Sequence, residues 1–307
     1  MEQEIIRWIQ SECETSSEFV SVGIGDDAAI ITPSGPLVLT TDTIAEGTHF
    51  DQHQMGLANI GRKAMAVNLS DLAAMGARPR AALVTFQLPY ELNLAQVKTL
   101  FLGMKRLATE YHVAIVGGDT NRWSGPLTVG ATLIGSAYQT NKTESVFWSL
   151  AGGRPGDGIW VSGSFGGSIL RHHFEFEPQN RLAKHLVTHH QITAATDVSD
   201  SLAHDLSQLA GASHTGFEID SRLIPISDDA VQQSASTGRS PLDHALYDGE
   251  DFQLICCASP DQEPTIGEDT ELSDNFRRIG RLTETTDFTM INDAGSSEPL
   301  IIKGFQH

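Results

Sequence analysis

The first half of the chain alternates between short apolar runs and longer stretches with helical spacing. Two apolar runs joined by a Pro-Ser-Gly-Pro turn predict strands at residues 28–31 and 37–41, the second ending directly before Asp42. Further apolar runs predict strands at 81–88, 113–116 and 127–134. Between them, apolar residues recur at helical spacing from about 56 to 75 and from 94 to 111. The helix over 56–75 would carry Asp71 near its carboxyl end.

The second half again mixes both periodicities. It predicts strands at 159–162, 217–219 and 252–256 and helices around 181–190 and 201–209. Residues 258–275 are polar and rich in Pro, Glu and Asp, so we expect a surface loop or insertion there. The whole pattern predicts an α/β or α+β fold.

The length of 307 residues favours two domains, because single domains most often have about 100 to 150 residues. A hydrophobic content of 40% predicts a folded globular protein. A polar stretch lies before the turn Gly152-Gly-Arg-Pro-Gly-Asp157. We therefore expect the boundary near residues 139–150, with domains at 1–140 and 150–307.

The net charge and the cysteines limit the classes of partner and the cellular compartment that we expect for the protein. The 20 basic and 39 acidic residues give a formal net charge of -19, which repels nucleic acid at long range and argues against a DNA or RNA partner. No apolar run approaches the roughly 20 residues that cross a bilayer, so we expect no membrane association. The 3 cysteines form no Cys-x-x-Cys pair, and a reducing, cytoplasmic location fits them best.

Acidic residues recur at the ends or starts of apolar runs. They are Asp26, Asp27, Asp42, Asp71, Asp119, Asp197 and Asp200. Any one of them alone is explained as a turn residue or a helix cap. Several unrelated segments, however, place Asp beside small residues that permit close backbone approach. Together these carboxylates predict a site for Mg²⁺, which prefers oxygen ligands and is commonly shared with nucleotide phosphates.

Three shorter motifs leave a structural interpretation open. Ser199 is a candidate N-cap for the helix near residue 201, with Asp200 in its first turn, which leaves Asp197 unexplained. The segment Gly-Glu-Asp at 249–251 is either a turn before a strand or an acidic pair that faces a ligand. We expect the histidine pairs at 172–173 and 189–190 on the surface, and the two adjacent cysteines at 256–257 in a buried strand.

The motifs together resemble the thiamine-monophosphate kinase family. The first half contains Gly-Ile-Gly-Asp-Asp-Ala at 23–28, Thr-Thr-Asp-Thr at 40–43, Glu-Gly-Thr-His-Phe at 46–50, Ala-Val-Asn-Leu-Ser-Asp-Leu-Ala-Ala-Met-Gly-Ala at 66–77 and Gly-Gly-Asp-Thr at 117–120. The second half adds Pro-Gly-Asp at 155–157, Asp-Val-Ser-Asp at 197–200, Gly-Glu-Asp at 249–251 and Gly-Phe at 304–305. These matches follow the order of the family and span nearly the whole chain.

The resemblance implies the two-domain fold of the aminoimidazole ribonucleotide synthetase superfamily. In that fold, an amino-terminal α/β domain dimerises through its sheet, and a carboxyl-terminal α/β domain closes over ATP. The implied reaction is the Mg²⁺-dependent transfer of the ATP γ-phosphate to thiamine monophosphate, giving thiamine diphosphate and ADP. The implied partners are ATP, thiamine monophosphate, several Mg²⁺ ions and a second copy of the chain.

The resemblance also assigns roles to individual residues. The implied metal ligands are Asp27, Thr40, Thr41, Asp42, Asp71, Asp119, Asp197 and Asp200, of which Asp42, Asp71, Asp119 and Asp200 are the implied catalytic residues. ATP would contact Gly118, Asp119 and Ser199. Thiamine monophosphate would contact His49, Glu250 and Phe305.

Three positions depart from the family pattern. Ser201 and Asp248 stand where the family usually has glycine, and Leu150 stands where an arginine that contacts ATP is expected. Two alternatives therefore stay open. The chain could be another ATP-dependent synthetase of the same superfamily, or a catalytically silent relative that binds nucleotide or metal.

Overall fold

The computed structural model describes residues 2–13, 17–140, 146–273 and 275–303. The chain divides into two compact units. The first comprises residues 1–72 and 77–137, and the second comprises residues 73–76 and 138–307. A search of the described residues finds no helix with the length and apolar character that crossing a membrane requires.

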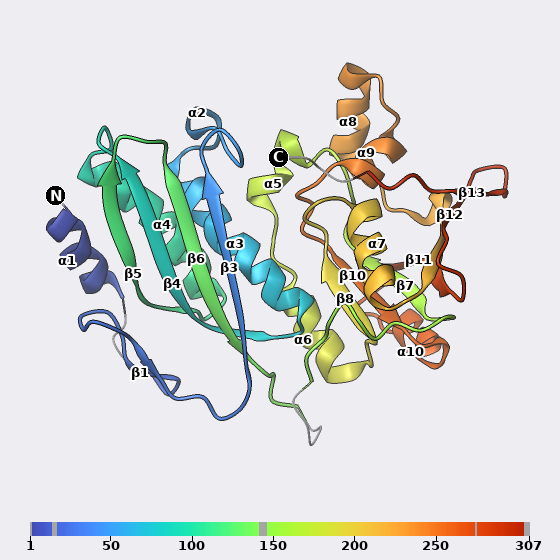
Figure 1. The fold of residues 1–307 in the computed structure, drawn as a ribbon, viewed down its shortest axis with the longest axis horizontal. Coiled ribbons are helices and arrows are strands. Elements are labelled where there is room, and N and C mark those ends of the chain that lie inside the picture. Colours follow the sequence, from blue (N-terminus) through green and yellow to red (C-terminus); the bar gives the residue numbers. More distant parts are fainter. Residues whose placement is uncertain (1, 14–16, 141–145, 274, 304–307) are drawn as a thin grey trace. The chain divides into compact units, whose positions relative to one another are not determined.

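The first unit is built on a four-stranded sheet in the order β3-β6-β4-β5 (Figure 1). Its strands are β3 (Leu37–Ala45), β6 (Thr128–Ser136), β4 (Arg78–Pro89) and β5 (Ala114–Trp123). β6 pairs antiparallel with β3 and β4, whereas β4 and β5 are parallel. The parallel pair is connected by α4 (Leu94–Glu110), which begins at a capping box formed by Asn93 and Gln96.

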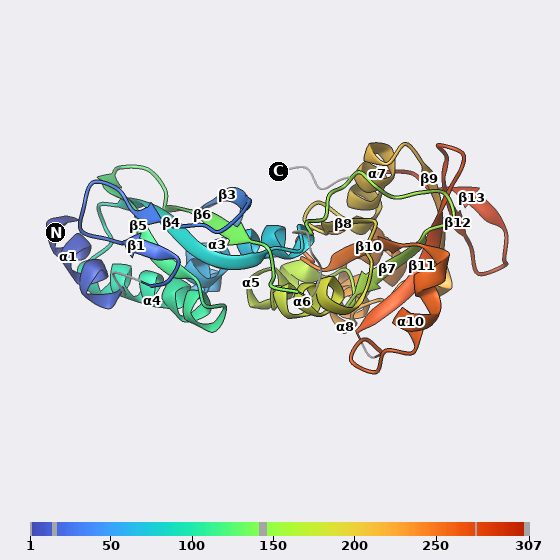
Figure 2. The ribbon, with the colours of Figure 1, turned by 90° about the horizontal axis from the view of Figure 1, so that it is seen from below.

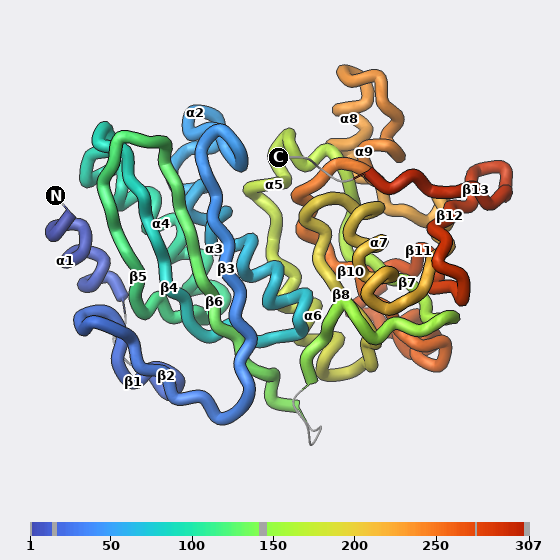
Figure 3. Tube along the Cα trace, viewed as in Figure 1, coloured from blue at the N-terminus to red at the C-terminus, as the bar shows by residue number. Residues whose placement is uncertain are grey.

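The two faces of this sheet differ. α3 (Leu57–Ala74) and α4 cover one face (Figure 2). On the other face, the hairpin of β1 (Val20–Val22) and β2 (Ile30–Ile31), seen in the trace of Figure 3, packs Phe19 and Val20 against Ala81 and Val116. α1 (Glu2–Glu12) lies beside this hairpin, and the short α2 (Gln52–Met55) follows β3. The rest of that face, which we call the open face, leaves Leu39 and Leu83 65% and 37% exposed.

The second unit contains a seven-stranded sheet in the order β13-β12-β9-β11-β7-β10-β8. Its strands are β7 (Gly158–Ser162), β8 (Ala194–Asp197), β9 (Gly216–Asp220), β10 (Leu254–Ala258), β11 (Phe276–Thr283), β12 (Phe288–Ile291) and β13 (Ser297–Pro299). Neighbouring strands pair antiparallel, except β12 and β9, which are parallel. The helices are α5 (His172–Glu175), α6 (Asn180–His189), α7 (Leu202–Ala212), α8 (Asp228–Thr237), α9 (Pro241–Tyr247) and α10 (Glu263–Gly267), with short 3-10 turns at Ser168–Leu170, Ser221–Leu223 and Pro260–Gln262.

Both faces of the central strands in the second unit are buried. Ile255 and Cys257 of β10 join the core that contains α7, whereas Leu254 and Cys256 join the core that contains α6. This division follows from strand geometry, because successive side chains point to opposite faces of a sheet. The prediction of two buried cysteines in a strand is confirmed.

The structure corrects two predicted strand ends in the first unit. β3 continues through Asp42 to Ala45, and β5 continues through the Gly-Gly-Asp motif to Trp123. Asp and Gly are poor strand residues, so the sequence predicted an end at both places. Pairing with the neighbouring strands, in which Asp42 lies opposite Ala131 and Asp119 opposite Thr85, extends the strands through these residues.

In the second unit, the structure differs from the prediction for one segment and for the histidine pairs. The segment 258–275 is not only a surface loop, because it forms α10 and buries Ile266 and Leu272 in the core. The histidine pairs are not wholly on the surface either, since His173 and His190 are only 7% and 5% exposed. A mostly polar segment with a few well-placed apolar residues gives a weak periodic signal, which explains the first error.

Candidate functional site

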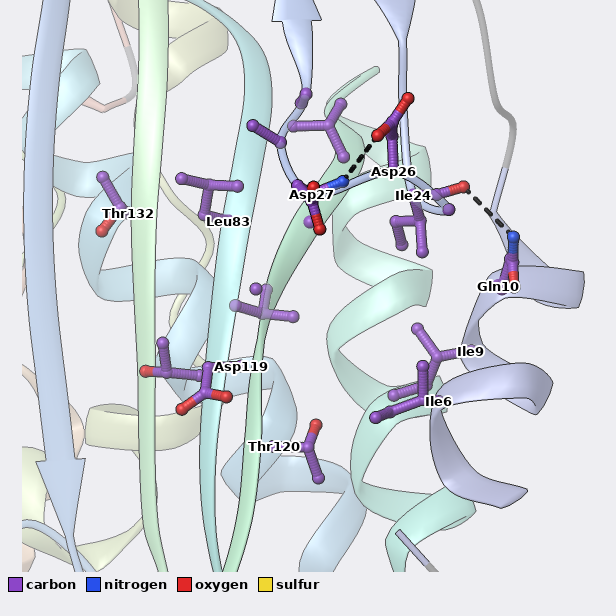
Figure 4. A pocket seen from close by; sticks show the side chains of 18 of the residues that line it. Ile6, Ile9, Gln10, Ile24, Asp26, Asp27, Leu83, Asp119, Thr120 and Thr132 are labelled. Atoms are coloured by element: carbon purple, nitrogen blue, oxygen red, sulfur yellow. Dashed lines mark hydrogen bonds between the residues drawn. The ribbon is translucent and has the colours of Figure 1, made fainter. Parts of the chain in front are cut away.

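A cleft lies on the open face of the first unit. Its volume is about 910 Å³, and it lies between α1, the loop that joins β1 to β2, and strands β4, β5 and β6. Asp27 from the loop and Asp119 from β5 both line it, together with Thr132 from β6 (Figure 4). The loop is tied to α1 by a hydrogen bond of 3.5 Å from the Gln10 amide to the Ile24 carbonyl. Two predicted metal ligands that are 92 residues apart in sequence number therefore share one cleft.

Gly118 occupies a position in the cleft that no other residue can take without displacing the backbone. Its φ is +151°, and a Cβ atom there would lie 1.7 Å from the carbonyl oxygen of Val84 on the adjacent strand. Glycine thus lets β5 lie close against β4 while leaving the backbone of residue 118 exposed in the cleft. An exposed backbone beside a carboxylate suits close approach by a phosphate-bearing ligand.

Strand β3 divides the remaining predicted ligands of the first unit between its two faces. Thr41 is exposed, and its hydroxyl lies 2.8 Å from that of Thr132, which lines the cleft. Thr40 and Asp42 point the other way, toward α3, because side chains alternate along a strand. There, the Thr40 hydroxyl donates a hydrogen bond to the Asp71 carboxylate.

Asn68 is a residue that the sequence predictions missed. It is fully buried on α3, and its side-chain oxygen accepts a hydrogen bond of 3.1 Å from the backbone N–H of Asp42. Its amide nitrogen donates to the Ala64 carbonyl at 3.1 Å. Asn68 therefore fixes the backbone of β3 next to Asp42. Its spacing of three residues from Asp71, which places both on one helix face, is the signal that could have identified it.

His49 follows β3, in a loop that a buried lysine stabilises. The His49 Nδ1 accepts a hydrogen bond of 3.1 Å from the Ala45 N–H, and its carbonyl accepts one of 2.9 Å from the Lys63 ammonium. Lys63 is 0% exposed, which is rare for a lysine. The helical spacing of Lys63 from Ile60 and Val67, two apolar positions of the 56–75 helix, was the sequence signal for this residue. Its contact with the loop indicates that Lys63 positions His49.

In the second unit, the predicted residues lie on two adjacent loops. The N–H of Glu250 donates to the Ser199 carbonyl at 2.7 Å, and the N–H of Phe252 donates to the Val198 carbonyl at 2.8 Å. Asp197, at the end of β8, lies opposite Leu254 of β10 in the ladder. These bonds bring the segment 197–200 and the segment 249–251 together.

Asp205 holds the backbone at the end of the first of these loops, residues 197–200. Its Oδ2 accepts hydrogen bonds from the backbone N–H groups of Asp200 at 2.9 Å and Ser201 at 3.1 Å. Burial raises the pKa of Asp205, and hydrogen bonds from Ser201, His204 and Asp200 oppose that rise. One ligand atom each from Asp200, His204 and Asp205 lie within 4.8 Å of one another. Oxygen and nitrogen donors are therefore concentrated at this loop.

Asp251 supports the second loop. It is 1% exposed, and its Oδ1 accepts a hydrogen bond of 2.9 Å from the Gly166 N–H. Burial raises the pKa of this carboxyl well above its ordinary value. The flanking residues Glu250 and Phe252 have φ of 60° and 49°, a region that costs non-glycine residues about 1 kcal/mol or more. The Glu250 carboxylate lies 3.3 Å from His173 Nδ1. Backbone strain concentrated at one buried acidic loop is typical of a functional site.

The structure explains two of the three departures from the family pattern. Ser201, not Ser199, is the N-cap of α7, and its hydroxyl also donates to the Lys303 carbonyl at 3.1 Å. Asp248 accepts a hydrogen bond of 3.0 Å from the Gly167 N–H and forms an ion pair of 2.9 Å with Arg239. Leu150 is exposed, and nothing in the structure explains its replacement of a cation. Phe305 lies outside the described residues.

The predicted ligands thus form three groups. Asp27, Thr41 and Asp119 belong to the open face of the first unit, whereas Thr40, Asp42 and Asp71 lie between β3 and α3. Asp197, Ser199, Asp200 and Glu250 lie on the paired loops of the second unit. Within the described ranges, no three of Asp27, Asp42, Asp71 and Asp119 bring their carboxylate oxygens within 4.8 Å of one another.

Known proteins match the chain along most of its length. Residues 25–137 match the AIR synthase related protein, N-terminal domain, and residues 154–292 match the AIR synthase related protein, C-terminal domain. A thiamine-monophosphate kinase of Rhodopirellula baltica is 37% identical over 316 residues, covering 100% of this chain and 97% of that protein.

Solved structures agree with these sequence matches. AaThiL complexed with AMPPCP and TMP superposes with a TM-score of 0.77 at 26% identity, covering 100% of this chain and 96% of that one. The crystal structure of thiamine-monophosphate kinase from Stenotrophomonas maltophilia also gives 0.77, at 31% identity and with 94% of each chain covered. The predicted α/β fold with two domains of this type is confirmed.

Proposed function

The chain belongs to the thiamine-monophosphate kinase family of AIR synthase related proteins, and we propose that it transfers the γ-phosphate of ATP to thiamine monophosphate. The observation that carries this proposal is the match over the full length of the chain to a kinase of that name, at 37% identity. AaThiL, whose structure holds AMPPCP and TMP, supports the same pair of substrates.

The reaction requires little proton transfer, but it must bring two negatively charged phosphates together. An oxygen of the thiamine monophosphate phosphate attacks the γ-phosphorus of ATP, the bond to the β-phosphate oxygen breaks, and ADP leaves. The attacking phosphate is already a nucleophile, so the protein needs to align two anions rather than supply a general base. In a protein with a net charge of -19, the repulsion between these anions must be offset by bound cations.

Several Mg²⁺ ions fit the ligands that the chain offers. The proposed ligands are Asp27, Thr40, Thr41, Asp42, Asp71, Asp119, Asp197 and Asp200. All of them present oxygen atoms, which Mg²⁺ prefers, and the contact between Thr40 and Asp71 already brings two of these oxygens together. When bound, Mg²⁺ would neutralise the phosphates and hold them in line. Of these ligands, Asp42, Asp71, Asp119 and Asp200 are the proposed catalytic residues.

The cleft on the open face is the proposed nucleotide site of the first unit. Its volume of about 910 Å³ lies within the range of roughly 300 to 1,000 Å³ that is usual for ligand pockets. Gly118 would offer its exposed backbone to a phosphate, and Asp119 would reach the phosphate through a metal ion. Ser199 of the second unit is a further proposed contact of ATP.

Thiamine monophosphate has a cationic thiazolium ring, which calls for an anion and an aromatic side chain. Glu250 and Phe305 are the proposed contacts of that ring, and His49 is the proposed third contact of the substrate. Glu250 suits the role because Asp251 and the paired loops hold its backbone in a fixed, strained conformation. The hydrogen bond from Lys63 to the His49 carbonyl would fix the position of His49.

We also propose that the protein is a homodimer formed through the open face of the first sheet. Leu39 is a large apolar residue on that face, 65% exposed and outside the lining of the nucleotide cleft, and such exposure is unfavourable in water. Leu39→Glu should weaken dimerisation at least about tenfold, since each tenfold change requires about 1.4 kcal/mol. Leu102→Glu on α4, an exposed leucine outside that face, is the matched control. Sedimentation equilibrium that finds equal dimerisation in the two variants would contradict this interface.

The kinase assignment is tested by incubating the protein with ATP, Mg²⁺ and thiamine monophosphate and resolving the products by chromatography. We expect one thiamine diphosphate per ADP, and no product when EDTA replaces Mg²⁺. Thiamine, which lacks the acceptor phosphate, is the matched control and should give no thiamine diphosphate. Binding of ATP without turnover would instead support a silent relative, and ATP consumption with a purine precursor alone would support another synthetase of the superfamily.

A further inference from the structure

Three potential metal ligands converge at the carboxyl end of α6. His185 lies in the last turns of this helix, His190 is its C-cap, and Asp269 follows α10. The Asp269 Oδ2 lies 2.7 Å from His185 Nε2 and 2.8 Å from His190 Nε2. The three ligand atoms all lie within 4.8 Å of one another. None of these residues belongs to the site described above.

The second nitrogen of His185 is also engaged by a carboxylate. Its Nδ1 lies 3.0 Å from Glu271 Oε2, while its Nε2 faces Asp269. A neutral imidazole has a single N–H, so it can donate to only one of these two carboxylates. If Nδ1–H donates to Glu271, the lone pair of Nε2 faces the oxygen of Asp269, and a cation between them is required to remove the repulsion. Either a proton or a metal ion can supply that charge.

The surrounding groups favour a doubly charged cation. The Asp269 carboxylate faces the imidazoles of both His185 and His190. Glu271 brings a second carboxylate. In the described part of the chain, neither carboxylate forms an ion pair with a lysine or arginine. Two negative charges beside two imidazoles make a site that a divalent ion neutralises.

The ligands are also held in place before any ion binds. The Asp269 Oδ1 accepts a hydrogen bond of 3.0 Å from the Glu271 N–H, which leaves Oδ2 directed at the two imidazoles. The His190 N–H donates to the Leu186 carbonyl at 2.9 Å, so the C-cap geometry fixes this residue. Outer hydrogen bonds of this kind orient metal ligands and raise their affinity.

We propose that His185, His190 and Asp269 form a Zn²⁺ site that is separate from the Mg²⁺ ligands. Two imidazole nitrogens and one carboxylate oxygen are a zinc donor set, and water would complete the tetrahedron. Mg²⁺ rarely takes imidazole ligands, so Mg²⁺ should bind at the oxygen ligands and Zn²⁺ at this cluster. Glu271 orients His185 through Nδ1 in the manner of a carboxylate–histidine–zinc triad.

The site is structural in role. It links α6 to the segment that leads into β11, a segment whose buried contacts are few and include Ile266 and Leu272. A ligand that binds only the folded state stabilises it, so zinc should hold this segment against the core.

The experiment uses the full chain, stripped of metal and kept in excess Mg²⁺ so that the oxygen sites are occupied. Titration calorimetry with ZnCl₂ should show one Zn²⁺ per chain, and zinc should raise the thermal midpoint. Asp269→Asn, which keeps the size and an acceptor oxygen, should lower the zinc affinity more than about 100-fold, and Glu271→Gln about tenfold. With Co²⁺ in place of Zn²⁺, the wild type should show the intense visible absorption of a four-coordinate ion.

His189→Gln is the matched control, because His189 is exposed on the same helix with its ring centroid 4.7 Å from that of His185. It should bind zinc as the wild type does. Loss of binding in His189→Gln together with retention in Asp269→Asn would overturn the ligand assignment. No saturable zinc binding in the presence of Mg²⁺, with an unchanged thermal midpoint, would show that a proton alone occupies the cluster and would overturn the proposal.

Discussion

The two units hold their acidic residues by different means. In the first unit, Asp42 and Asp71 stand on regular elements, a paired strand and a long helix, and a buried amide supports the backbone beside them. In the second unit, Asp200 and Glu250 stand on loops. Regular elements hold a side chain through their own hydrogen-bond ladders, whereas a loop needs separate support.

That support comes from two buried carboxylates: Asp205 accepts two backbone N–H groups, and Asp251 accepts one. Burial raises the pKa of both carboxyls. We therefore expect that removing an acidic residue has different consequences in the two units. In the first unit, we expect the loss of a proposed ligand while the fold persists, whereas in the second unit, the loss of a supporting acid should displace the proposed ligands and alter stability.

The largest loss of turnover is expected from substitutions in the first unit. Asp42→Asn and Asp71→Asn should each lower turnover by two orders of magnitude or more, since each removes a proposed metal ligand, and leave the thermal midpoint nearly unchanged. Steady-state assays of thiamine diphosphate formation measure the loss. Asp51→Asn is the matched control, because Asn replaces Asp equally well at the N-cap of α2. Ordinary activity in either ligand variant would show that the site has been misassigned.

A smaller loss is expected from Asp205→Ala, which removes the acceptor for the N–H groups of Asp200 and Ser201. Turnover should fall about 10- to 100-fold, and the Mg²⁺ concentration for half-maximal rate should rise. Asp205→Asn keeps one acceptor oxygen and should restore most of the activity. A purely structural role would instead lower the thermal midpoint in both variants without changing the Mg²⁺ requirement.

The smallest effect concerns stability and pH. Because burial raises the pKa of Asp251 above its ordinary 3.8, the folded chain retains a proton that the unfolded chain releases above that value. This carboxyl therefore lowers the free energy of unfolding as the pH rises from about 4 toward the folded-state pKa. Asp251→Asn, which has no carboxyl to titrate, should flatten that fall. Urea unfolding in EDTA at several pH values measures the free energy of unfolding, and a pH profile equal to that of the wild type would contradict the raised pKa of Asp251.

Much of the fold was predictable because its signals are local. The helices around Val67 and Phe101 have strong apolar periodicity, and the structure places both where the sequence predicts them. The paired loops of the second unit were also indicated, since Asp197 lacked a capping explanation. The family resemblance named the same loops.

Other features depend on contacts that no local pattern records. β3 runs past Asp42 because β6 pairs with it, and the assignment of Thr40 and Thr41 to opposite faces follows from that register. The N-cap of α7 is Ser201 and not the predicted Ser199, because the Asp205 carboxylate and the Lys303 carbonyl hold Ser201 in place. Burial of His190 required a partner, Asp269, from a segment 79 residues away.

We propose that the carboxylates of the first unit hold the divalent ions that join two phosphates. Crystals grown with Mn²⁺, a non-hydrolysable ATP analogue and thiamine monophosphate allow the metal positions to be found by anomalous scattering. We predict anomalous peaks at bonding distance from the carboxylate oxygens of Asp42 and Asp71, next to the nucleotide phosphates. Peaks that contact neither carboxylate, with ordered nucleotide present, would contradict it.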